Sequence, residues 1–114
     1  MSSPHLERGR QGEELAAAWY RNHGFELVAR NWRCPSGEVD LIVRRGRLLV
    51  VCEVKSRRSD AYGGPAAAVG RLKQQRLRRL AAEWLATSGV HSVDVRFDVV
   101  AITGVDVEVI EAAF

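Results

Sequence analysis

Charged residues occupy positions in this chain where β-strand sequences seldom carry charge. Glu38 and Asp40 lie in the apolar segment 38–43, and Glu53 lies with Lys55 in the apolar segment 48–55. Acidic residues are depleted in strands and are rarely buried without a partner. Carboxylates that converge repel one another unless a cation neutralises them, and Mg²⁺ prefers one or two carboxylates completed by water and phosphate. The pattern therefore predicts a site for a divalent cation, Mg²⁺ or Mn²⁺.

Lys55 adds a second chemical function to this group. A lysine beside a metal-bound water can orient that water or remove a proton from it. The chain has fifteen arginines and only two lysines, Lys55 and Lys73. Arginine would serve in a surface ion pair but does not readily release a proton. The combination is typical of metal-assisted phosphodiester hydrolysis. The alternative left open is a solvent-facing strand on which Glu53 and Lys55 keep the sheet soluble.

The loop between the two segments decides whether the carboxylates meet. Side chains alternate between the faces of a strand, so residues two apart share a face. With an even loop centred on residues 45–46, Val43 lies opposite Leu48, and Asp40 and Glu53 become diagonal neighbours on one face. An odd loop separates them unless a bulge corrects the register.

Basic residues are concentrated around this hairpin. Residues 44–79 include eleven basic side chains and only two acidic ones, a net charge of +9, whereas the whole chain carries +3. Such a block attracts polyanions, most often nucleic acid. The alternative is an arginine-rich surface that is merely solvated. The residues expected to bind phosphates are Arg57, Arg58, Lys73 and Arg76.

The rest of the chain supplies the elements that must position these residues. Its length of 114 residues suits a single domain over residues 1–114. Hydrophobic periodicity and turn residues predict an α/β protein, a mixed sheet with helices packed on it, in the order α-β-β-β-α-β, or α-β-β-β-α-β-β if residues 105–110 add an edge strand. Helices are expected over 12–23 and 66–87, and strands over 25–33, 38–43, 48–55, 93–102 and 105–110.

Several classes of protein do not fit the sequence. It has no apolar run near the ~20 residues that span a bilayer, so no membrane association is expected. Cys34 and Cys52 form no CxxC pair, which argues against a disulfide scaffold or a cysteine-built zinc site and fits the cytoplasm.

Four segments carry a resemblance to a known family: Gly12-Glu13, residues 37–42 (GEVDLI), residues 52–57 (CEVKSR) and residues 96–100 (RFDVV). They resemble the YraN-type family of small bacterial proteins over about residues 9–102. That family is similar to the archaeal Holliday-junction resolvases and is assigned to the PD-(D/E)xK superfamily. The resemblance implies a restriction-endonuclease-like mixed β-sheet flanked by helices. It also implies a Mg²⁺- or Mn²⁺-dependent DNA endonuclease, acting on branched or processed DNA, and it suggests a homodimer.

The resemblance also assigns roles to individual residues. Asp40 matches the first metal-binding aspartate, Glu53 the second acidic ligand and Lys55 the catalytic lysine. Glu13 matches an acid that the resolvases carry on a helix. Glu38 belongs to the YraN-type pattern either as an extra metal ligand or as a surface carboxylate.

Two other functions compete with a nuclease. The chain could be a non-catalytic nucleic-acid-binding module that keeps the nuclease fold, in which case DNA binding would ignore Asp40, Glu53 and Lys55. It could also be an adaptor whose basic helix docks on an acidic protein.

Overall fold

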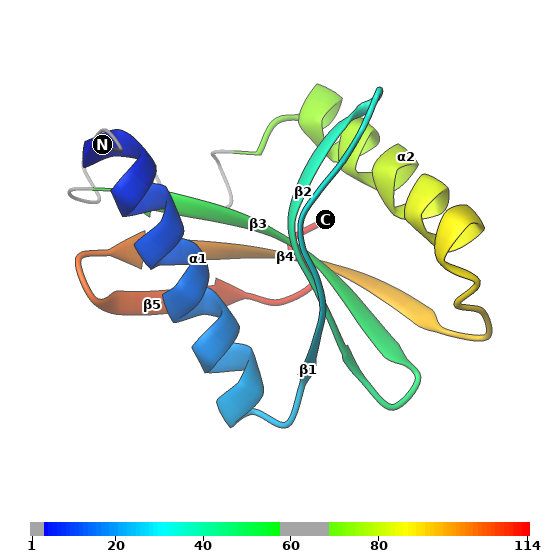
Figure 1. The fold of residues 1–114 in the computed structure, drawn as a ribbon, viewed down its shortest axis with the longest axis horizontal. Helices are drawn as coiled ribbons and strands as arrows, with labels where there is room; N and C mark the ends of the chain where they lie inside the picture. The colour runs from blue at the N-terminus through cyan, green and yellow to red at the C-terminus, as the bar shows by residue number, and fades with distance from the viewer. Residues whose placement is uncertain (1–3, 58–68) are drawn as a thin grey trace.

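A computed structural model describes residues 4–57 and 69–114 as one five-stranded sheet with a helix on each face (Figure 1). The element order and the α/β class are those predicted from the sequence. The elements are α1 Pro4–Asn22, β1 Glu26–Cys34, β2 Gly37–Arg45, β3 Leu48–Arg57, α2 Arg71–Ser88, β4 Asp94–Thr103 and β5 Asp106–Ile110.

The sheet is mixed, with the strands in the order β1-β2-β3-β4-β5. Strands β3 and β4 are parallel, and the other three neighbouring pairs are antiparallel. A parallel pair needs a crossover connection, and α2 lies in the one between β3 and β4. Strand β4 lies inside the sheet, and the edge strand predicted over 105–110 is confirmed as β5.

Alternate side chains of β3 face the two layers of the hydrophobic core on opposite sides of the sheet. Leu49 and Val51 pack in the cluster that includes α2, whereas Val50 and Cys52 pack in the cluster that includes α1. This is the period of two expected for a strand covered on both faces. The apolar stripe of α2 is buried, with Leu77, Leu80, Ala81 and Trp84 facing the sheet.

Both helices differ from the predicted ranges at their first residues. Helix α1 begins at Pro4 rather than at residue 12, because the helix continues through Gly9 and Gly12 despite their low helix propensity. Helix α2 begins at Arg71 rather than at residue 66, because Gly70 is extended and serves as the N-cap. Residues 66–68 lie outside the described residues. The predicted end of α2 is confirmed, with Gly89 in the left-handed conformation that favours glycine.

The hairpin between β2 and β3 is even, but its register is shifted from the predicted one. Arg45 pairs with Leu48 across a two-residue turn, and Val43 pairs with Val50 instead of Leu48. The shift is by two residues, so every side chain keeps its face. The consequence is that Asp40 and Glu53 directly follow the last pair of the ladder, Leu41 and Cys52.

Candidate metal and phosphate site

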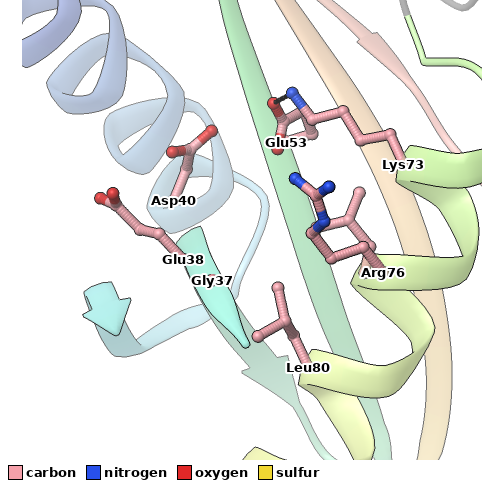
Figure 2. Close-up of a pocket in the computed structure, with 8 residues that line it drawn as sticks. Gly37, Glu38, Asp40, Glu53, Lys73, Arg76 and Leu80 are labelled. Carbon is pink, nitrogen blue, oxygen red and sulfur yellow. Dashed lines mark ion pairs between the residues drawn. The ribbon is translucent and has the colours of Figure 1, made fainter. Parts of the chain in front are cut away.

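A pocket of about 240 Å³ lies where β2 and β3 separate beneath α2 (Figure 2). The strands contribute carboxylates, and the helix contributes cations and apolar side chains. The pocket is lined by Gly37, Glu38, Asp40, Glu53, Lys73, Arg76, Leu77 and Leu80. The three carboxylates that the sequence placed together therefore border one pocket, and they face two of the four predicted phosphate-binding cations.

Asp40 occupies the gap where the β2–β3 ladder ends. Its Oδ2 accepts a hydrogen bond of 2.8 Å from the backbone N–H of Val54. The Asp40 side chain therefore supplies the acceptor for a β3 N–H just beyond the end of the β2–β3 pairing. Burial is the main cause that raises the pKa of Asp40, and the negative charge of Glu53 adds to it, giving a pKa of about 7. The carboxyl is thus held in place while its negative charge is disfavoured.

Glu53 is the buried acid of the pocket, with 9% of its side chain exposed. Its Oε1 atom lies 2.5 Å from Lys73 Nζ and 3.5 Å from Lys55 Nζ. Figure 2 shows Lys73 extending from α2 to reach Glu53 on β3. One carboxylate oxygen is therefore shared by the only two lysines in the chain.

The two ammonium groups affect each other. The nearby Lys73 ammonium, together with burial, lowers the pKa of Lys55. Burial is the largest single influence and works against the charge of Lys73, but the hydrogen bond with Glu53, the contact with Lys55 and the negative charges of Glu53 and Asp40 together outweigh it, so the pKa of Lys73 is raised. Lys73 is therefore the ammonium that Glu53 holds more firmly, and Lys55 is the more weakly held neighbour.

Glu38 and Glu13 are two further acids near Asp40, and each lies near an arginine rather than a lysine. Glu38 is paired with Arg33 at 3.3 Å, and its side chain points away from Glu53 (Figure 2). Glu13 lies on α1 and does not line the pocket, although its charge contributes to the raised pKa of Asp40. The Oε2 atom of Glu13 is buried without a hydrogen-bond donor and lies 3.7 Å from Arg30 Nε.

The predicted phosphate-binding residues divide into two groups. Lys73 and Arg76 are one helical turn apart on α2 and both line the pocket. Arg57 is the last residue of β3, and its side chain lies outside the described part, as does the whole of Arg58.

The sequence analysis missed the contact between Lys73 and Glu53. It assigned Lys73 to phosphate binding alone. The helical spacing of residues 73, 76, 77 and 80 is a signal that could have placed Lys73 on the pocket side of α2, since all four line the pocket.

The carboxylates of the pocket meet part of the coordination that a hard divalent cation needs. Among residues 4–57 and 69–114, no three acidic, histidine or cysteine side chains gather closely enough to hold one ion together. Asp40 and Glu53 supply two carboxylates at one pocket, which is the number that Mg²⁺ often takes before water and phosphate complete its shell. The residues present therefore fit a cation that is shared with solvent and a phosphate.

Asp98, another strand acid, is a structural residue. It is 1% exposed and accepts hydrogen bonds from the Tyr20 hydroxyl, the Arg96 guanidinium and the backbone N–H of Ala112. These donors satisfy its charge within the fold, and Asp98 does not line the pocket.

Comparison with known proteins identifies the family. Residues 12–102, which include the whole pocket lining, match the model of "Uncharacterised protein family UPF0102". The chain belongs to the UPF0102 family. A UPF0102 protein of Beutenbergia cavernae is 55% identical over 94 residues, which are 82% of this chain and 80% of the relative. A second, from Rhodococcus jostii, is 56% identical over 97 residues, covering 85% of this chain and 82% of the relative.

More distant UPF0102 relatives extend over more of the chain. The UPF0102 protein of Syntrophus aciditrophicus is 43% identical over 113 residues, which are 96% of this chain and 89% of the relative. In the described part of this UPF0102 chain, neither helix has the length and apolar character needed to cross a membrane.

Proposed function

We propose that this UPF0102 protein is a Mg²⁺- or Mn²⁺-dependent DNA endonuclease of the PD-(D/E)xK type that acts in the cytoplasm on branched or processed DNA. One observation carries the proposal. Two carboxylates on adjacent strands, the half-buried Asp40 and the buried Glu53, face two cations on α2 across one pocket, with Lys55 beside Glu53. The resemblance to YraN-type proteins and to the resolvases supports the same assignment.

Each group has a distinct task in this proposal. Asp40 and Glu53 would hold the cation, which when bound polarises a phosphate oxygen and makes water a better nucleophile. Lys55 orients the attacking water. Lys73 and Arg76 bind the phosphate oxygens, since both cations project from α2 into the pocket. Glu13 acts on Asp40 through its charge.

A non-catalytic nucleic-acid-binding module is the second candidate. It is favoured by the arrangement at Glu53, whose Oε1 already has two lysine partners, and by the lack of a third metal-binding side chain among the described residues. This candidate predicts salt-dependent DNA binding that needs no divalent ion and ignores replacement of Asp40.

DNA cleavage by matched variants separates the two candidates. Wild type should cut one or more members of a panel of linear, nicked, flapped and four-way DNA in Mn²⁺. Asp40→Ala, Glu53→Gln and Lys55→Met should lose at least about 100-fold in rate, as expected when a group needed for the chemical step is removed. Asp94→Asn, which removes an exposed acid at the start of β4, five residues along the β3–β4 ladder from the Glu53 pair, is the control. Equal cleavage by wild type and Asp40→Ala would show that the activity comes from elsewhere.

A further inference from the structure

Lys73 contacts Oε1 of Glu53, one of the two carboxylate oxygens through which this residue could bind a metal ion. Its ammonium lies 2.5 Å from Glu53 Oε1, closer than that of Lys55 at 3.5 Å. The contact is sheltered, since 9% of the Glu53 side chain and 35% of the Lys73 side chain are exposed. A half-buried, charge-assisted contact of this length is stronger than an ordinary surface ion pair.

An ammonium and a divalent cation compete for the same oxygen. Both are attracted by the negative charge of Glu53, and both approach its lone pairs at short distance. Lys73 is tethered to α2, so its local concentration at Glu53 is high. An ion that binds Glu53 through Oε1 must therefore displace Lys73 or distort its contact.

A phosphate group beside Arg76 is an alternative partner for the Lys73 ammonium. Arg76 lies one turn further along α2 and lines the same pocket, and no ion pair of Arg76 occurs among the described residues. Two neighbouring cations on one helix can share a phosphate group, whose oxygens accept several hydrogen bonds.

We propose that Lys73 is a tethered competitor of the metal ion: it neutralises Glu53 until a divalent cation replaces it, and the displaced ammonium then joins Arg76 on a phosphate. This inference rests on the proposed metal site and adds a regulatory step to it. Lys73 is accordingly a positioning residue for Glu53 as well as a phosphate contact.

Mn²⁺ binding to the DNA-free protein tests the inference without measuring cleavage. Electron paramagnetic resonance titration should show that Lys73→Met binds Mn²⁺ about tenfold more tightly than wild type, equivalent to about 1.4 kcal/mol. Lys73→Arg, which keeps a cation on the same turn, should stay near wild type. Arg76→Met is the matched control, because it removes one positive charge from the same pocket but no contact with Glu53. Its Mn²⁺ affinity should change by less than about threefold.

The remaining outcomes separate failure of this inference from failure of the proposed function. Equal tightening in Lys73→Met and Arg76→Met would overturn direct competition while leaving the metal site in place. If Lys73→Met binds Mn²⁺ with the affinity of wild type while Glu53→Gln abolishes binding, direct competition is likewise overturned and the metal site remains. If neither wild type nor Lys73→Met binds Mn²⁺, or if Glu53→Gln leaves binding intact, then the proposed metal site and the competition both fail.

Discussion

At the scale of single residues, Asp40 is a carboxyl group whose ionised form is disfavoured by its surroundings. Burial and the nearby Glu53 carboxylate raise its pKa to about 7, while the Val54 N–H fixes its position. A carboxyl with this environment gains from a cation placed beside it. The same environment makes the ionised side chain costly for the fold when no cation is bound.

Asp40→Asn should therefore stabilise the protein at neutral and higher pH in the presence of a chelator. The folded-state pKa of Asp40, about 7, lies above the ordinary value of 3.8. Between these values the folded state binds more protons than the unfolded state, so the wild-type free energy of unfolding falls as the pH rises through this window. Asparagine has no such titration and can still accept from Val54 N–H.

Urea unfolding of wild type and Asp40→Asn at pH 5 and pH 8 measures this effect. The advantage of Asp40→Asn should grow by on the order of 2 kcal/mol between the two values. Asp106→Asn, a change at an exposed acid in β5, should show no such trend. A stability difference for Asp40→Asn that does not vary with pH would contradict the assigned environment.

At the scale of elements, the approach of α1 to β3 depends on Gly12. A Cβ atom built on Gly12 would collide with the Ser56 Oγ, whereas one built on Gly9 meets nothing within 4 Å. The helix therefore lies close to the strand that carries Glu53 and Lys55. Glu13, the next residue of α1, is held near Asp40 by the same contact.

Gly12→Ala should lower the free energy of unfolding by about 1–3 kcal/mol, the usual cost of forcing extra volume into a packed contact. Gly9→Ala is the matched control on the same helix. It should raise the stability by up to about 1 kcal/mol, because alanine is the better helix former and the space is open. Chemical denaturation of both variants measures this, and equal effects would show that Gly12 is not at a close approach.

The elements also show what the sequence could and could not predict. Periodicity predicted the helix α2 and the faces of the hairpin, because both depend on local spacing. The hairpin register was wrong by two residues, since pairing depends on the turn that forms at Gly46–Arg47. The contact of Lys73 with Glu53 depends on the position at which α2 packs along β3. That position is set by the tertiary packing of residues such as Leu77 and Leu80.

At the scale of the whole molecule, charge segregation should govern DNA binding. The net charge of +9 in residues 44–79 contrasts with +3 for the chain, so the remainder is acidic. Two of the five basic residues of α2, Lys73 and Arg76, lie at the pocket, whereas Arg21 on α1 is paired with Glu14. A polyanion is therefore expected to approach along α2.

Arg76→Gln should weaken DNA binding and reduce the slope of log K against log salt by about 1, because one phosphate contact is lost. Arg21→Gln is the control with the same change of charge, and its slope should equal that of wild type. Fluorescence anisotropy over a series of salt concentrations measures both slopes. Equal reductions in the two variants would show that net charge alone controls binding.

Location of a bound ion tests the central claim most directly. Crystals of the wild-type protein soaked in Mn²⁺ should give an anomalous difference peak bonded to the carboxylates of both Asp40 and Glu53, and crystals of Asp40→Asn should lose it. A strong peak that contacts neither carboxylate, or a peak that survives unchanged in Asp40→Asn, would contradict the account.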